Sequence, residues 1–354
     1  MTYSTAVQPG DVVAITGEVA ARPLYQALSR EILRAGGLPV VIPRFDEVPA
    51  DLLQLASDDQ LTWVSPVDRW IYGEADVYIR VEAEENTKVL SGIAPERQVA
   101  RQRHWGQLVS RLLERTAAGE VRWVITLYPT DAYAQDAEMA TADFADFVFS
   151  ACKLSEADPA AAWRQQAATQ QRLINWLTGR KLVHLRGPGT DLKLVIEGRL
   201  WENCDGTQNF PDGEICTSPV EDATEGHVRF SYPIVTDGRE IHDVRLRFER
   251  GRVVDAAASQ GETYLIETLD ADPGARRLGE LAFGTNFDIT RFSKSILFDE
   301  KIGGTVHMAI GAGFPDLGGT NDSAIHWDLI CDLRDGGAVD VDGEPFLRDG
   351  RYLV

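Results

Sequence analysis

The sequence predicts an α/β N-terminal domain with a parallel sheet, followed by an α+β, strand-rich C-terminal domain. Two observations lead to this fold class. In the first half, short apolar runs alternate with segments whose apolar residues recur at helical spacing, which is typical of a doubly wound parallel sheet. After about residue 180, helical periodicity fades, Gly, Asp and Thr become frequent, and short strand-like runs follow one another. We therefore expect two domains, 1–180 and 181–354.

The first half opens with a β-α-β pattern. Residues 11–16 (DVVAIT) and 38–43 (LPVVIP) are apolar, β-rich runs, and residues 20–35 between them carry apolar side chains at helical spacing until two glycines end the segment. Such a unit implies neighbouring parallel strands with a right-handed crossover. Further strands are expected at 75–81 and 122–128, and further helices at 95–118, 140–153 and 159–178.

The second half reads as short strands separated by turns. Gly187-Pro188-Gly189 and Thr236-Asp237-Gly238 are turn signals. One helix is expected at 264–269. The expected strands are 182–185, 192–196, 228–232 and 244–248.

The composition limits the classes of function. The 354 residues carry a formal net charge of -20, and such a surface repels phosphate backbones and anionic lipids, so we expect no nucleic-acid partner and no membrane partner. The N-terminus lacks the pattern of a signal peptide, and cytoplasm is the expected location. Four widely spaced cysteines without a CxxC pair predict reduced, buried thiols: Cys152, Cys204, Cys216 and Cys331.

The sequence lacks the motifs of two common catalytic scaffolds. Thr16-Gly17-Glu18 follows the first strand, but neither GxGxxG nor a Walker-type GxxxxGK[ST] is present, so a nucleotide cofactor is not expected. A GxSxG elbow is also missing, which argues against a serine hydrolase of the α/β class.

Two glutamates lie in contexts that suit buried carboxylates. Glu214 follows the turn signal Pro211-Asp212-Gly213, which presents it at the start of a short strand. Glu280 lies between Gly279 and the apolar run 281–283, where a carboxylate costs free energy unless it is paired or bound to a metal ion. The alternatives are a solvated loop charge at Glu214 and, at Glu280, a buried ion pair or an exposed strand face.

Two histidines lie in apolar runs near these glutamates. His307 lies among glycines that suggest close backbone approach, although a core histidine is the alternative. His326 and Asp328 form an H-x-D pair in a strand-like run, so both side chains project to one face and suit a first-row metal ion. With Glu214 and Glu280 these make five ligands, too many for one open tetrahedral zinc, and we expect two divalent ions sharing a carboxylate. The other histidines are interpreted as structural or exposed: His104, His184, His227 and His242.

From about Gly187 to Arg334 the chain resembles the thermophilic-type metallo-aminopeptidases, the family of aminopeptidases T and S. The matching blocks are GTDLKLVIEGRLW, NFPDGEICTSP, LGELAFGTN, LFDEKIGGTVHMAIGAGFP and NDSAIHWDL. The first half matches only as a generic α/β domain. The resemblance implies a homodimer whose active site faces an internal cavity. It also implies that the metal ligands are Glu214, Glu280, His307, His326 and Asp328.

One position departs from that family's pattern. The family usually has a tyrosine seven residues after the first histidine, proposed to aid catalysis, and this chain has Phe314 there. A phenyl ring cannot donate a hydrogen bond to a developing oxyanion. If the tyrosine has that role, this chain is slower, uses another donor, or acts on a different substrate.

The resemblance implies a metallo-aminopeptidase that hydrolyses the N-terminal peptide bond of peptides with two divalent ions (Zn, Co or Mn) and a metal-activated water. Glu280 or Glu214 is the expected general base. Two alternatives stay open. The scaffold also resembles the ring-cleaving dihydroxypyridine dioxygenases, which use one iron held by two histidines and one carboxylate, although their additional histidine falls at Glu280. A non-catalytic binding protein with a degenerate site is the other alternative, which Phe314 keeps open.

Overall fold

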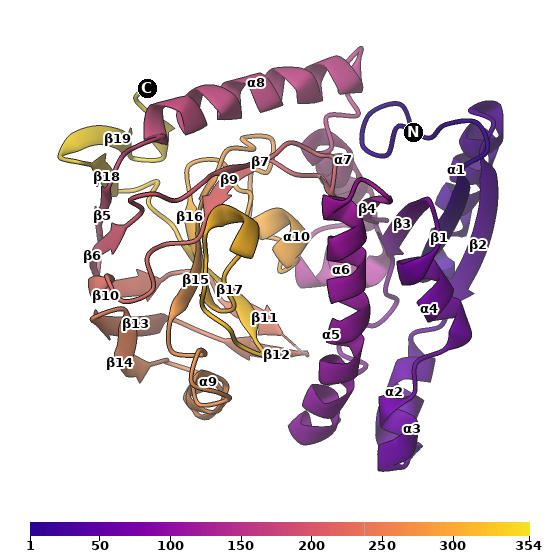
Figure 1. Cartoon of the computed structure of the whole chain (residues 1–354), viewed down its shortest axis with the longest axis horizontal. Helices are drawn as coiled ribbons and strands as arrows, with labels where there is room; N and C mark the ends of the chain where they lie inside the picture. Colours follow the sequence, from indigo (N-terminus) through magenta and orange to yellow (C-terminus); the bar gives the residue numbers. More distant parts are fainter. Residues whose placement is uncertain (237) are drawn as a thin grey trace. The chain divides into compact units, whose positions relative to one another are not determined.

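The computed structural model describes residues 1–236 and 238–354 (Figure 1). The expected turn at 236–238 therefore lies partly outside the described residues, and so does the side chain of His104, whose expected role is not tested. The further side chains outside the description are those of Pro95, Val99, Gln102 and Arg103. The chain forms two compact units: Met1–Val148 with Gly206–Phe210, and Phe149–Asp205 with Pro211–Val354. The division into domains 1–180 and 181–354 stays a prediction.

The first unit contains a parallel sheet in the strand order β2-β1-β3-β4-β8. The central strand β1 has five consecutive buried residues, because apolar side chains cover both faces of the sheet. The predicted parallel sheet is confirmed. Its strands are β1 Val12–Glu18, β2 Leu38–Arg44, β3 Val77–Glu82, β4 Arg122–Leu127 and β8 Asn209–Phe210.

Helices connect these strands, and four of them, α2 to α4 and α6, were not predicted from the sequence. All four are short, and three begin at local caps: Ser57 and Gln60 form a capping box, Ser65 caps a helix that opens with Pro66, and Thr130 caps α6. The elements are η1 Val19–Ala21, α1 Arg22–Arg34, α2 Glu47–Leu55, α3 Asp58–Thr62, α4 Pro66–Gly73, α5 Pro95–Ala117, α6 Asp131–Asp136 and α7 Thr141–Ala151. Among the described residues, no helix is both long enough and apolar enough to cross a bilayer.

The strand β8 corrects one sequence interpretation. Asn209 and Phe210 open the block NFPDGE, which was grouped with the second half of the chain. They instead pair in parallel with Ile125 and Thr126 of β4 and belong to the first unit. A two-residue strand carries no periodicity from which its pairing could be predicted.

The second unit begins with α8 Pro159–Leu177 and is otherwise rich in antiparallel strands. In its described residues, strands form an eight-stranded sheet of order β14-β13-β10-β6-β5-β18-β19-β20, a five-stranded sheet of order β17-β16-β15-β9-β7, and the pair β11-β12. The eight-stranded sheet comprises β5 Leu182–Gly187, β6 Thr190–Val195, β10 Glu225–Phe230, β13 Val244–Glu249, β14 Arg252–Ala257, β18 Ala338–Val341, β19 Glu344–Arg348 and β20 Arg351–Tyr352.

The five-stranded antiparallel sheet carries most of the sequence blocks singled out above. Its strands are β7 Glu202–Cys204, β9 Glu214–Thr217, β15 Leu278–Gly284, β16 Val306–Gly311 and β17 His326–Cys331. The remaining elements are β11 Ile234–Thr236, β12 Arg239–Ile241, α9 Glu262–Leu269, α10 Ile296–Asp299 and η2 Pro315–Leu317. The predicted strand-rich second part is confirmed, and α9 is the helix expected at 264–269.

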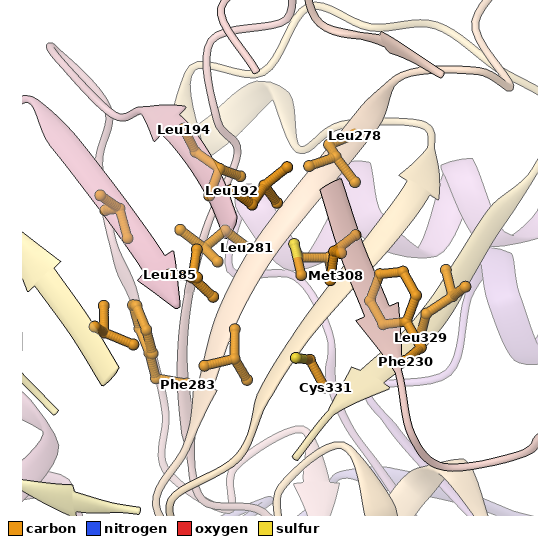
Figure 2. Close-up of a cluster of buried hydrophobic side chains, with 14 of the residues drawn as sticks. Leu185, Leu192, Leu194, Phe230, Leu278, Leu281, Phe283, Met308, Leu329 and Cys331 are labelled. Atoms are coloured by element: carbon orange, nitrogen blue, oxygen red, sulfur yellow. The ribbon is translucent and has the colours of Figure 1, made fainter. Parts of the chain in front are cut away.

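Apolar side chains from both antiparallel sheets meet in one core (Figure 2). Leu185 and Leu192 come from the eight-stranded sheet, and Leu281, Phe283 and Met308 come from the five-stranded sheet. Because strand side chains alternate, these residues fix one face of the five-stranded sheet toward the core. The residues between them in sequence therefore project from the opposite face, where polar side chains can gather.

Candidate metal centre

The pairing of β15, β16 and β17 brings four predicted residues to one face of the five-stranded sheet. Glu280 pairs with Ala309, and Ala309 pairs with Asp328. Directly paired residues of antiparallel strands project to the same face, as do residues two apart on one strand. His307 and His326 therefore share the face of Glu280 and Asp328, opposite the apolar core.

Glu214 joins the same face through the neighbouring strand β9. It pairs with Gly284, which lies four residues after Glu280 on β15. The turn at 211–213 presents Glu214 as the first residue of β9, as the sequence predicted. All five predicted residues thus lie together although 114 positions separate the first from the last in the sequence.

Distances within this cluster place Glu280 at its centre. Its Oε1 lies 3.5 Å from Nε2 of His307, and its Oε2 lies 3.0 Å from Nε2 of His326. On one side, Glu214 Oε2 lies 3.5 Å from His307 Nδ1, and on the other, Asp328 Oδ1 lies 3.6 Å from His326 Nε2. The five residues form two adjacent groups of three, which share Glu280: Glu214, Glu280 and His307, and Glu280, His326 and Asp328.

Backbone carbonyls orient the two imidazoles. Nδ1 of His307 lies 3.0 Å from the carbonyl oxygen of Glu300, and Nδ1 of His326 lies 2.9 Å from that of Ala312. If each Nδ1–H donates to its carbonyl, each Nε2 presents a lone pair toward Glu280. Two lone pairs that face a carboxylate repel it unless a cation or a proton lies between them.

Two carboxylate oxygens in the cluster have no hydrogen-bond partner among the described residues. Glu214 Oε2 and Asp328 Oδ1 are buried and accept no hydrogen bond from the described residues. A buried carboxylate oxygen without a partner costs free energy, and a bound cation removes that cost. Oxygen and imidazole donors in this mixture suit Zn, Co or Mn. The residues present therefore fit divalent metal ions.

The ionisable groups of the cluster shift one another's pKa values. Burial raises the pKa of the Glu214 carboxyl well above its usual value. Burial acts in the same sense on Glu280, but hydrogen bonds from His307 and His326 outweigh it and hold the pKa of Glu280 below its usual range. Burial would lower the pKa of His307, but Glu214 and Glu280 raise it to about 10. Protons on the imidazoles therefore balance the carboxylates until metal ions displace them.

Sequence reasoning missed three charged residues beside the cluster, of which Lys301 and Asp212 are buried and Glu300 is partly buried. Lys301 is fully buried, pairs with Glu300, and its Nζ lies 3.8 Å from Glu214 Oε1. Asp212 is buried near Glu214. The adjacent charges of Glu300 and Lys301 lie between the apolar Phe298 and Ile302, which is the signal that could have identified them.

The remaining singled-out residues lie as follows. The ring of Phe314 is centred 5.1 Å from that of His326, so the position of the family's tyrosine adjoins the cluster. His184 pairs with Asp191 at 2.7 Å, and among the described residues it belongs to no candidate ligand group. Among the described residues, His227 and His242 also belong to no candidate ligand group. All four cysteines are free, and Cys204 and Cys216 have sulfurs 3.9 Å apart.

A cluster of carboxylates and imidazoles on one face of a sheet, partly buried and with two oxygens that lack a hydrogen-bond partner among the described residues, has the composition of a metal centre. The sequence profile described as Thermophilic metalloprotease (M29) matches residues 1–352. The chain therefore belongs to the thermophilic metalloprotease family M29, and the predicted family, fold class and enzyme class of metal-dependent hydrolase are confirmed.

Individual relatives match along nearly the whole chain. Aminopeptidase 2 of Geobacillus stearothermophilus is 26% identical over 98% of this chain and 94% of its own length. Aminopeptidase T of Thermus thermophilus is 27% identical over 98% of this chain and 95% of its own length. The solved structure of wild-type AmpT from Thermus thermophilus superposes with a TM-score of 0.86 at 27% identity, covering 100% of this chain and 97% of that one.

Proposed function

We propose that this protein is an aminopeptidase that hydrolyses the N-terminal peptide bond of peptides with two divalent metal ions. One observation supports this most strongly: two groups of potential ligands adjoin each other and share Glu280. A shared carboxylate between two ion positions is what a dinuclear centre requires. The relatives in the M29 family are named aminopeptidases, which supports the substrate class.

The residues would divide between two ions. Glu214 and His307 would hold one ion, His326 and Asp328 the other, and Glu280 both. When bound, the ions act as Lewis acids on the scissile carbonyl and lower the pKa of a bound water. The chain's carboxylates attract the positively charged amino terminus of a peptide. Glu280 or Glu214 accepts the proton of the attacking water and passes it to the leaving amine.

The geometry favours the dinuclear centre over the dioxygenase alternative. His307, His326 and Glu280 would supply the two histidines and one carboxylate of a mononuclear iron site. Glu214 and Asp328 add two further carboxylates beside the same histidines, which is more than one such iron needs. The experiment below also tests the alternative of a non-catalytic binding protein.

Metal content and turnover together test the proposal. Elemental analysis of the purified chain should give two divalent ions per chain, and hydrolysis of leucyl p-nitroanilide should depend on Zn, Co or Mn and stop with a chelator. The variants His326→Ala and Glu280→Gln should lose metal, whereas His227→Ala, at an exposed histidine outside the cluster, should not. One iron per chain with oxygen consumption would support the dioxygenase, and loaded sites without turnover would support a binding protein.

Two further expectations remain predictions. A homodimer would have twice the 39.1 kDa of one chain, which light scattering on the eluting peak of a sizing column measures directly. Location in the cytoplasm is checked by fractionation of the source cells.

A further inference from the structure

A cavity of about 200 Å³ lies beside the candidate metal centre. Its lining includes His326 and Asp328 of β17, together with β11 and the start of α10. β17 is the edge strand of the five-stranded sheet, and β11 contacts it (Figure 1). All of these elements belong to the second unit. The cavity therefore begins at two of the predicted metal ligands.

The wall of this cavity is mainly apolar. Ile330 lies two residues after Asp328 on the same strand face, so it continues the surface of the metal centre into the cavity. The other lining residues with largely apolar side chains are Pro233, Ile234, Val235, Phe292, Ile296 and Trp327.

Apart from the predicted ligands His326 and Asp328, the charged groups of the wall already have partners. Lys294 Nζ lies 3.0 Å from Glu240 Oε1. Asp299 Oδ1 accepts hydrogen bonds from the backbone N–H of Ser293 at 2.7 Å and from its hydroxyl at 2.8 Å. A ligand group that enters the cavity beyond His326 and Asp328 therefore meets mainly apolar surface, an ion-paired lysine and a hydrogen-bonded carboxyl group.

We propose that this cavity receives the side chain of the substrate's N-terminal residue and selects an uncharged, apolar one. The inference rests on the proposed aminopeptidase function. His326 and Asp328 lie at the end of the cavity nearest the metal centre. If the substrate's α-amino group is held there, the side chain of the N-terminal residue lies only a few bonds from the cavity mouth.

The size and chemistry of the cavity define the preferred side chain. An apolar cavity of about 150 Å³ holds a benzene molecule, so this one accommodates leucine, methionine or phenylalanine. Alanine and glycine leave the space unfilled and lose the gain from burying methylene groups. A lysine or glutamate side chain would be desolvated beside a lysine that is already paired with Glu240 and a carboxyl group that is already hydrogen-bonded to Ser293. The expected order of kcat/KM is therefore leucine and phenylalanine above alanine, and alanine above lysine and glutamate.

Substitutions at two lining residues from different elements test this assignment. Val235 is partly exposed on β11 and Ile296 is 46% exposed on α10, so each can be replaced by tryptophan without filling a tight core. In Val235→Trp and in Ile296→Trp, kcat/KM for leucyl and phenylalanyl p-nitroanilide should fall at least tenfold. For alanyl p-nitroanilide it should change less than threefold, and the metal content should be unchanged. Val41→Trp, at a 38% exposed valine of the parallel sheet, is the matched control and should keep the wild-type ratio.

A binding measurement separates failure of this inference from failure of the proposed function. Calorimetry on the metal-loaded chain should show tighter binding of the product leucine than of alanine, and Val235→Trp should abolish the difference. If turnover is absent but this difference exists and depends on Val235, the pocket stands and the aminopeptidase function does not. A wild-type preference for charged N-terminal residues, or an unchanged leucine-to-alanine ratio in both metal-loaded tryptophan variants, would overturn the pocket assignment while leaving the function intact.

Discussion

At Phe314, adding a single hydroxyl oxygen to the side chain should change the rate of hydrolysis. Its ring adjoins that of His326, and its backbone N–H donates to Ser218 Oγ at 2.8 Å, which fixes its place beside the metal centre. Phe314→Tyr would place a hydroxyl donor there, and removing a comparable donor from other enzymes costs about 100- to 1,000-fold in kcat. We expect kcat for leucyl p-nitroanilide to rise about tenfold or more with little change in KM. A variant with unchanged kcat would indicate that another donor stabilises the oxyanion.

Lys301 should stabilise the second unit mainly when metal ions are absent. Its buried ammonium faces Glu214 and Glu300, and its pKa is raised well above its usual value because these carboxylates outweigh the burial that would lower it. Removing one partner of a buried ionic group costs about 3–5 kcal/mol. Lys301→Met should therefore lower the free energy of unfolding by about that amount in chelator, as measured by urea denaturation.

Saturating metal should reduce that loss, since bound cations neutralise the same carboxylates. The control is Lys181→Met, because Lys181 forms an exposed pair with Glu197 whose expected contribution is below about 1 kcal/mol. Equal losses in the two variants would mean that Lys301 has no special role.

These residues also show how far a site can be predicted from sequence. Glu280 and His307 were identifiable because a charged or polar group within an apolar strand needs a partner. Lys301 and Glu300 obey the same rule, yet they neighbour each other at the end of the short helix α10, where two opposite charges resemble a solvated surface pair. Their burial results from the packing of the second unit, which no local pattern encodes.

At the scale of elements, Gly279 permits a contact that orients His326. A Cβ on Gly279 would lie 2.0 Å from the carbonyl oxygen of Ala312, and that oxygen lies 2.9 Å from His326 Nδ1. Gly279→Ala should displace the carbonyl and misorient the imidazole. We expect at least a tenfold weaker metal affinity, the size of effect typical of changes to groups that orient a ligand. Isothermal titration with Zn measures this, and Gly73→Ala, where a Cβ meets nothing within 4 Å, controls for the loss of a glycine.

Asp272 should make the stability of the segment before β17 depend on pH. Its Oδ2 accepts hydrogen bonds from the N–H of Ala324 at 2.7 Å and from the hydroxyl of Ser323 at 2.9 Å. These two residues lie two and three positions before His326. Burial would raise the pKa of Asp272, but these and two further backbone hydrogen bonds hold it below its usual value. The stabilisation is therefore present above the unfolded pKa of about 3.9 and is lost as pH falls through the lower folded pKa.

Asp272→Asn tests that dependence. We expect it to lower the free energy of unfolding by about 1–2 kcal/mol at pH 7, because hydrogen bonds to an ionised acceptor are lost. The difference from wild type should shrink as the pH is lowered toward 3, as followed by urea denaturation at each pH. Asp335→Asn, at an exposed aspartate, should give no such trend. A difference that stays constant with pH would mean that the charge of Asp272 is not responsible.

The elements themselves were predictable in proportion to their length and periodicity. The long helices α5 and α8 and the strands β1 to β4 follow directly from apolar spacing. The helices α2 to α4 and α6 were missed because nine residues or fewer give too few turns for a periodic signal, although the caps at Ser57, Ser65 and Thr130 mark three of their starts. The pairing of β8 with β4 is non-local and leaves no pattern in the sequence.

At the scale of the whole molecule, the site depends on strand order. β9 pairs with β15 although more than 60 residues separate them, and only this pairing brings Glu214 next to His307. Alternation within each strand was predictable, so the faces of His326 and Asp328 were known in advance. Which strands neighbour one another was not, because the core between the two antiparallel sheets selects that arrangement (Figure 2).

Metal binding should therefore stabilise the folded molecule, and the size of this stabilisation indicates how many ions bind. A ligand that binds only the folded state stabilises it by about 2.7 kcal/mol at 100 times its Kd, so two ions should contribute about twice that amount. Thermal unfolding at increasing metal concentration should show the effect as a rising Tm. Glu280 belongs to both ligand groups, whereas His326 belongs to one. Glu280→Gln should thus remove most of the metal-dependent rise, and His326→Ala about half of it. Equal losses in the two variants would instead indicate a single ion that both residues hold.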